Sequence, residues 1–80
     1  HTAVQLRERM RLLGITTADV ERLGHGLMWD LERTCARCNQ KGTCKRDLAT
    51  HPHDPSWGGY CPNAVALTAV ENAMHHFPTP

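Results

Sequence analysis

The chain has 80 residues, which is enough for one small domain, residues 1–80, and no more. Its formal net charge of +1 at pH 7 provides no global field for binding nucleic acid or acidic membranes, and no apolar run is long enough to span a bilayer. A core of this size is marginal and often depends on disulfides, a metal or a partner, so the four cysteines are the first candidates for a structural staple.

Two short helices are predicted in the first part of the chain. Apolar residues recur at helical spacing from Ala3 to Leu13, and Gly14 follows where a left-handed residue commonly ends a helix. The other positions of this helix form a polar face: Arg7, Glu8, Arg9 and Arg11. Thr16 provides a hydroxyl cap, and Asp19 an acid in the first turn, for a second helix that runs to Leu23.

A third helix is predicted from Leu27 to Asn39, and it carries the first two cysteines. Leu27, Leu31, Cys35 and Cys38 follow one another at intervals of four, four and three residues, which places them on one helix face. We therefore expect the cysteine pair on the buried face at the end of this helix, where thiolates are shielded from water.

A break and a short helix follow the cysteine pair. Lys41-Gly42 interrupts the helical pattern, and Thr43 is placed to cap a helix from Cys44 to about Thr50. Two prolines and a Gly-Gly pair then mark the segment His51–Gly59 as an irregular loop.

The last helix is predicted from Pro62 to His76. Cys61 then stands near its N-cap, where the helix macrodipole favours a thiolate. Its apolar stripe contains Val65, Ala66, Leu67, Ala69, Val70, Ala73, Met74 and Phe77. No stretch alternates apolar and polar residues as a strand does, so the predicted fold is all-α, a small bundle of four to five short helices around a four-cysteine site.

The candidate site lies between residues 33 and 63 and contains every cysteine of the chain: Cys35, Cys38, Cys44 and Cys61. Three chemistries fit this set. Four converging thiolates can hold an iron–sulfur cluster, and the bacterial ferredoxin run also ends in Cys-Pro. They can hold structural zinc, with His51 or His53 in place of one sulfur. They can also form two disulfides, either Cys35–Cys61 with Cys38–Cys44 or the crossed pairing.

Basic residues surround the cysteines, and no acid interrupts them: Arg33, Arg37, Lys41, Lys45 and Arg46. Four thiolates outweigh the charge of a zinc ion or an oxidised [4Fe-4S] core, so nearby positive charge lowers the cost of burying such a centre. Arg37 and Lys45 are the predicted electrostatic neighbours, and Trp57 and Tyr60 the predicted shields against water. A solvated helix face explains the same charges. No aromatic platform is interleaved with them, so nucleic acid is not the favoured partner.

Two resemblances follow from these motifs. The segment Arg33–Cys38 with Cys44, followed by Tyr60–Asn63, resembles a family of small uncharacterised bacterial proteins, a domain of unknown function with a C-x2-C-x5-C triad and a closing Cys-Pro-Asn. The triad spacing is also similar to that of oxygen-sensing regulators of the fumarate–nitrate reduction type and of WhiB-like regulators. That likeness implies Cys35, Cys38, Cys44 and Cys61 as ligands of a [4Fe-4S] cluster. It does not extend to a DNA-binding domain, so it implies a ligand set without a regulatory output.

The sequence thus predicts a small [4Fe-4S] protein that serves redox sensing or electron transfer with an unidentified protein partner. Motifs of hydrolytic or group-transfer chemistry are absent from the sequence, so we do not expect an enzyme. The alternative is a structural zinc-binding or disulfide-stapled helical domain that binds a partner through its first or last helix. A cytoplasmic location is expected, or a periplasmic one if the cysteines form disulfides.

Overall fold

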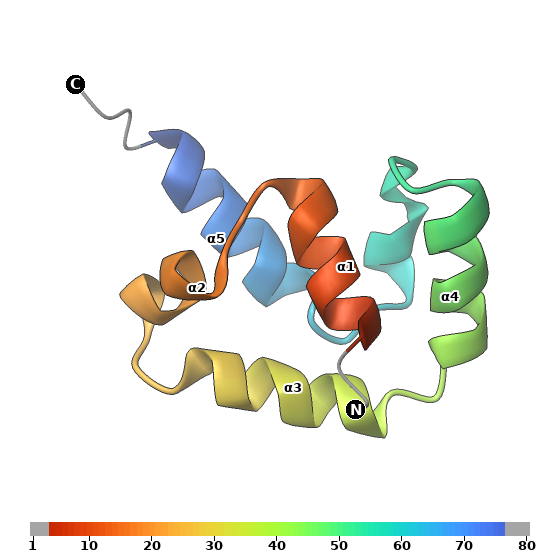
Figure 1. Cartoon of the computed structure of the whole chain (residues 1–80), viewed down its shortest axis with the longest axis horizontal. Helices are drawn as coiled ribbons and strands as arrows, with labels where there is room; N and C mark the ends of the chain where they lie inside the picture. Colours follow the sequence, from red (N-terminus) through yellow and green to blue (C-terminus); the bar gives the residue numbers. More distant parts are fainter. Residues whose placement is uncertain (1–3, 77–80) are drawn as a thin grey trace.

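Five α-helices and one 3-10 helix form residues 4–76 (Figure 1). This computed structural model describes the backbone of residues 4–76 and the side chains of residues 4–74. In chain order the elements are α1 Val4–Leu13, α2 Thr17–Leu23, α3 Leu27–Arg37, α4 Lys41–Thr50, the 3-10 helix η1 Pro55–Gly59, and α5 Ala64–His76. The expected all-α fold is confirmed, with no strand between residues 4 and 76. No helix in this range is both long enough and apolar enough to traverse a bilayer.

The hydrophobic core is built by α1, α2, α3 and α5, which lie together on one side of the molecule while α4 stands at the other (Figure 1). Val20 of α2 and Leu67 and Val70 of α5 are fully buried, and the other core residues surround them: Leu6, Met10, Ile15, Met28, Leu31 and Cys35. Helix α4 packs against α1 but contributes no buried residue. The core therefore fixes the cysteine on α3 much more firmly than the cysteine on α4.

The chain turns tightly between α1 and α2, as the sequence predicts. Gly14 has a φ of 74°, a left-handed conformation that glycine adopts without strain, and the Ile15 amide donates to the Met10 carbonyl over 3.1 Å. The Thr16 hydroxyl accepts from the Asp19 amide at 3.2 Å, and the Asp19 carboxylate accepts from the Thr16 amide at 2.9 Å. This capping box fixes the start of α2.

One carboxylate holds the turn between α2 and α3. Glu21 accepts a hydrogen bond from the Gly26 amide at 3.1 Å and another from the Met28 amide at 2.8 Å. These amides lie at the start of α3, where backbone N–H groups have no partner inside the helix. The two bonds hold the pKa of Glu21 below its ordinary value, the Met28 bond having the larger effect.

The predicted end of the third helix is wrong by two residues. Helix α3 ends at Arg37 instead of Asn39, and Cys38 has an extended backbone (φ −64°, ψ 130°). The Gln40 amide donates to the Cys38 sulfur over 3.3 Å, so the sulfur replaces a carbonyl that a continued helix would have provided. Cys38 consequently leaves the helix face that carries Cys35.

The predicted break at Lys41-Gly42 is also wrong, because α4 begins at Lys41 and includes Gly42. An exposed glycine inside a helix costs only about 1 kcal/mol relative to alanine. The Lys41 ammonium donates to the Ala36 carbonyl over 2.7 Å, and the Cys44 amide donates to the Gln40 carbonyl over 2.9 Å. These contacts start the helix three residues earlier than a Thr43 cap predicts.

The loop predicted at His51–Gly59 contains the short helix η1. Asp54 caps it by accepting a hydrogen bond from the Ser56 amide at 2.8 Å, and Pro55 occupies its first position. The amides of Tyr60 and Cys61 both donate to the Trp57 carbonyl, at 3.3 and 3.0 Å. The end of η1 therefore determines where the last cysteine lies.

The last helix begins at Ala64, so the predicted start at Pro62 is wrong and Cys61 lies outside the helix instead of at its cap. Asn63 precedes the helix: its carbonyl accepts from the Leu67 amide at 2.9 Å, and its buried side-chain amide donates to the Leu31 carbonyl of α3 at 2.9 Å. That bond ties the start of α5 to α3, next to the cysteines.

The apolar stripe of α5 is narrower than predicted. Leu67 and Val70 are buried, whereas Val65 is 86% exposed and Ala69 is also exposed. Phe77, and the side chains of His75 and His76, lie outside the described residues.

Leu67→Ala should lower the free energy of unfolding by about 2–5 kcal/mol, because it leaves a cavity among side chains that cannot close on it. Val65→Ala on the same helix is the matched control, and its effect should stay within about 0.5 kcal/mol. Urea unfolding followed by circular dichroism measures both. Equal effects of the two substitutions would contradict the packing described for α5.

The contribution of Glu21 should depend on pH. Because its folded-state pKa lies below the ordinary value of 4.5, the stability that its bonds provide is present above about pH 4.5 and is lost as the pH falls through the folded-state pKa. At pH 7, Glu21→Gln should therefore unfold at a lower temperature than wild type. At pH 3 the difference in unfolding temperature between the two proteins should be smaller. A gap that is independent of pH would argue against the carboxylate clamp.

Candidate metal centre

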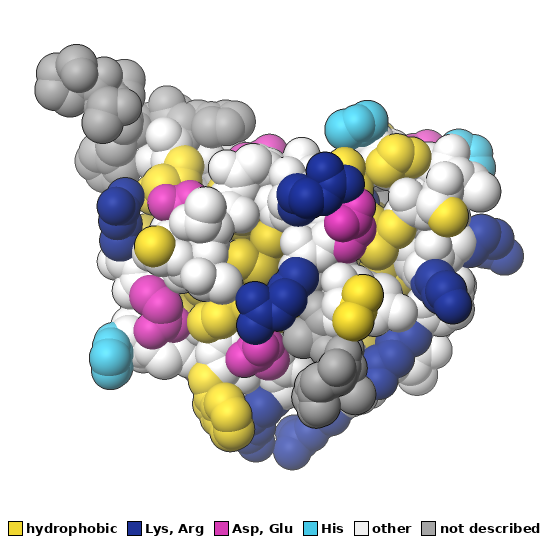
Figure 2. Space-filling view, in the orientation of Figure 1, with side chains coloured by type: hydrophobic (Ala, Val, Ile, Leu, Met, Phe, Trp, Pro, Cys, Tyr) yellow, Lys and Arg dark blue, Asp and Glu magenta, His cyan; other side chains and the backbone are white. Residues whose placement is uncertain are grey.

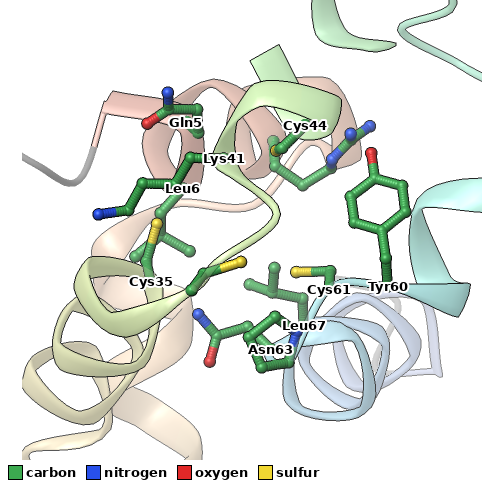
Figure 3. Close-up of a pocket in the computed structure, with 12 residues that line it drawn as sticks. Gln5, Leu6, Cys35, Lys41, Cys44, Tyr60, Cys61, Asn63 and Leu67 are labelled. Carbon is green, nitrogen blue, oxygen red and sulfur yellow. The ribbon is translucent and has the colours of Figure 1, made fainter. Parts of the chain in front are cut away.

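The four cysteines that the sequence singled out line one cavity. Cys35 comes from the last turn of α3, Cys38 from the segment after it, Cys44 from α4, and Cys61 from the segment between η1 and α5. Figure 3 shows Cys35, Cys44 and Cys61 around this cavity, approaching it from separate elements. All four are free thiols. The fold thus brings together residues that lie up to 26 positions apart in the sequence.

The thiols are near one another without forming a single-ion site. The cavity that they share is about 30 Å³ in volume. Within the part of the chain that the structure describes, no three side chains among His, Cys, Asp and Glu are close enough to hold one metal ion.

Three of the four cysteines have a pKa above the ordinary value of a thiol. Burial raises the pKa of Cys35, Cys44 and Cys61, and in each case it is the largest effect. The cysteines also raise one another's pKa, because several negative sulfurs in one cavity repel. Without a bound cation the site therefore favours neutral thiols at pH 7.

Each sulfur nevertheless has a hydrogen-bond donor directed at it. Backbone amides serve three of them: Leu6 at the start of α1 for Cys35, Gln40 for Cys38, and Asn63 for Cys61. The Leu6 and Asn63 bonds oppose the effect of burial and lower the pKa of their cysteines. The fourth sulfur, Cys44, faces the guanidinium of Arg9, whose charge likewise lowers the pKa of that thiol. Such donors stabilise thiolates better than they stabilise thiols.

Arg9 is the unexpected member of the site. The sequence predicts Arg9 on the polar face of α1. In the structure Arg9 is only 3% exposed and lines the cavity. Nη1 donates to the Pro52 carbonyl over 3.3 Å, and the guanidinium carbon lies 4.9 Å from the centre of the Trp57 ring. Nη2 is buried and has no hydrogen-bond partner, and no carboxylate among the described residues forms an ion pair with Arg9. A buried cation without a counter-anion is costly, so a negative charge in the cavity would be stabilised by Arg9.

A second positive charge comes from Lys41, which also lines the cavity and whose ammonium donates a hydrogen bond to the Ala36 carbonyl. The predicted neighbours Arg37 and Lys45 are exposed, and neither lines the cavity. Arg37 instead lines the open depression that Cys38 also lines, whereas Lys45 lines neither hollow. Arg9 reaches the site from a helix that is far away in sequence.

The two predicted aromatic shields have different positions. Tyr60 lines the cavity, and its hydroxyl donates to Asp47 of α4 at 2.9 Å. Burial and this bond raise the pKa of Tyr60 to about 12, so it remains a neutral wall of the site. Trp57 lies against Arg9 and the core instead of facing the thiols. It covers the cation and not the sulfurs.

The two histidines considered as substitute ligands lie elsewhere. His51 and His53 are exposed, and neither lines the cavity. The His51 ring contacts the Thr50 hydroxyl at 2.9 Å. Among the described residues that line the cavity, the four cysteines are therefore the ligands that zinc or an iron–sulfur cluster would ordinarily take.

The sequence contained signals for the two residues that were missed. Arg9 follows Leu6 by three positions and precedes Leu13 by four, which is the spacing of the buried face of α1. Asn63 stands immediately before the last helix, where an asparagine is a preferred cap. Neither signal reveals that the side chain faces the cysteines, since that depends on how α1, α3 and α5 pack.

Comparisons with known proteins leave the function to be inferred from these residues. The chain matches no family model, and neither the curated proteins nor the solved structures contain a significant match to it.

Arg9→Met should stabilise the metal-free chain, by about 1–3 kcal/mol, because it replaces an unpaired buried cation with an apolar side chain of similar length. Arg11→Met is the matched control on the same helix. Its exposed ion pair with Glu8 should be worth less than about 1 kcal/mol. Urea unfolding with a chelator and a reductant measures both. Destabilisation by Arg9→Met would mean that Pro52 and Trp57 satisfy the guanidinium and that the cavity needs no anion.

Proposed function

We propose that the four cysteines bind a [4Fe-4S] cluster and that the protein serves electron transfer or redox sensing. The observation that carries the proposal is the cavity itself, in which four thiols surround a space beside a buried and unpaired arginine. When bound, such a cluster accepts and releases one electron. The chain's own residues hold it, offset its charge and exclude water.

The charge of the site fits this proposal. Four thiolates outweigh the charge of an oxidised cluster, so the loaded centre is net negative. Arg9 and Lys41 are the cations that line the cavity, and the loaded centre supplies the anion that buried Arg9 lacks. The amides of Leu6, Gln40 and Asn63 donate to the sulfurs, and such bonds to cluster sulfurs influence the reduction potential.

The potential ligands alone do not choose between a cluster and zinc. The cavity offers four sulfurs, a set that an iron–sulfur cluster and a structural zinc ion both accept. The charge of the site favours the centre in its thiolate form, and metal analysis distinguishes the two.

The small volume of the cavity, about 30 Å³, means that one wall must move outward when a cluster is taken up. Helix α4 is the wall best suited to move, because it carries Cys44 but no buried residue. It is attached to its neighbours by polar contacts, including the Tyr60–Asp47 and Lys41–Ala36 hydrogen bonds. Moving it would leave the core formed by α1, α2, α3 and α5 intact.

Anaerobic reconstitution with ferrous iron and sulfide tests the proposal. The loaded protein should be brown, absorb broadly at about 400 nm, and contain iron and acid-labile sulfide in the ratio of a [4Fe-4S] core. Cys61→Ser should lose the absorbance, and it should unfold at a lower temperature than the loaded wild type because metal binding and folding are coupled. His53→Ala, at an exposed residue of the same loop region, is the control that should load normally.

Other outcomes overturn the proposal in distinguishable ways. A colourless protein that contains one zinc per chain would make the site structural. Thiols that resist alkylation until a reductant is added would indicate disulfides. An iron-free chain that melts at the same temperature as the iron-treated one would remove the coupling between site and fold.

A further inference from the structure

Cys38 lies between the candidate site and an open depression on the surface. It lines the inner cavity with the other three cysteines, and it also lines an open depression of about 440 Å³ with Thr34, Arg37, Asn39, Tyr60 and Pro62. Cys35, Cys44 and Cys61 do not line this depression. Of the four cysteines, Cys38 therefore connects the inner cavity to this depression.

The helix beside this depression carries an exposed stripe made of Trp29, Arg33 and Arg37, which we call the α3 stripe. Its members are four residues apart, so they lie on one face of α3. Trp29 is 64% exposed, although large aromatic side chains are normally buried, and both arginines are exposed. Tryptophan and arginine are the residues most enriched at the centres of protein interfaces.

Neither arginine of the stripe has an ion-pair partner among the described residues, and no acid occurs between Arg33 and Arg46. Asp30 and Glu32 precede these arginines on α3, and Glu32 is paired with Arg7 of α1. The next acid along the chain is Asp47, which accepts a hydrogen bond from the Tyr60 hydroxyl. Figure 2 shows Lys and Arg side chains gathered along the lower and right-hand parts of the molecule, where α3 and α4 lie. A surface that docks here must carry negative charge.

We infer that the Cys38 depression and the α3 stripe form the docking surface for an acidic redox protein, which exchanges one electron with the centre through Cys38. The inference rests on the proposed function and names its partner by chemistry. In the exchange the partner's cofactor loses one electron and the centre gains it, or the reverse, with no bond made or broken. A protein is favoured over nucleic acid because the chain's net charge is only +1 and its positive charge is local.

Electron transfer from a reduced acidic flavodoxin to the reconstituted chain tests this docking surface. Arg37→Glu should lower the second-order rate constant roughly three- to tenfold and weaken its dependence on salt, because steering by local charge acts on the encounter rate. Arg22→Glu makes the same charge change at an exposed residue of α2, and its rate should change less than about twofold. The basic protein cytochrome c should show the opposite response to Arg37→Glu.

Binding provides a readout that does not depend on electron transfer. Added flavodoxin should shift the amide NMR signals of residues 34–39 and 60–62 in the diamagnetic, zinc-substituted chain, and Arg37→Glu should remove those shifts. Equal effects of Arg37→Glu and Arg22→Glu, or shifts on another face, would overturn the docking surface. So would displacement of flavodoxin by random-sequence duplex DNA at lower concentration, which would identify a nucleic-acid surface.

Failure of the docking surface differs from failure of the proposed function. A chain that takes up iron and sulfide but whose electron transfer ignores Arg37 overturns only the docking inference. A chain that takes up neither, as shown by metal analysis of the same samples, overturns both.

Discussion

The cost of burying a positive charge beside four thiols is the constraint on which this structure depends. Arg9 lies inside the domain with Nη2 unpaired, while burial keeps three of the surrounding thiols in their neutral form. The buried arginine and the buried thiols are complementary. Thiolates would provide the counter-charge for the arginine, and the arginine would stabilise the thiolates. A cation that converts the thiols to thiolates therefore completes the core electrostatically as well as chemically.

The helices fall into two groups: four that share the hydrophobic core, and α4, which contributes no buried residue to it. Helices α1, α2, α3 and α5 surround the fully buried side chains, and the buried Asn63–Leu31 hydrogen bond joins α5 to α3 at the edge of the site. Helix α4 contributes Cys44 and no buried residue. A bond from Cys44 to a shared centre would therefore hold α4 against the rest of the fold, as hydrophobic burial holds the other helices. This is how a small chain compensates for a limited core.

The site is also asymmetric, which bears on its use. Its inner side is lined by Leu6, Leu67 and Arg9, whereas its outer side continues at Cys38 into an open depression of mixed polar and apolar lining. A closed inner side restricts water and holds the charge pattern fixed, and an open outer side brings one ligand within reach of another molecule. A redox centre that exchanges electrons with a partner needs both properties, and in the proposed centre they would belong to different cysteines.

The sequence by itself determined the helical fold, the turn at Gly14, the Thr16 capping box and the identity of the four cysteines, because each depends on residues within a few positions of one another. It misplaced the ends of the helices around Cys38, Lys41 and Cys61, where sulfur and lysine contacts between neighbouring segments override local propensity. Only the tertiary structure decided that Arg9 faces Cys44, that Lys41 replaces Arg37 and Lys45 at the cavity, and that Trp57 covers the arginine. Those facts depend on the packing of α1 against α3 and α4, whose contacts join residues far apart in the chain and leave no local pattern.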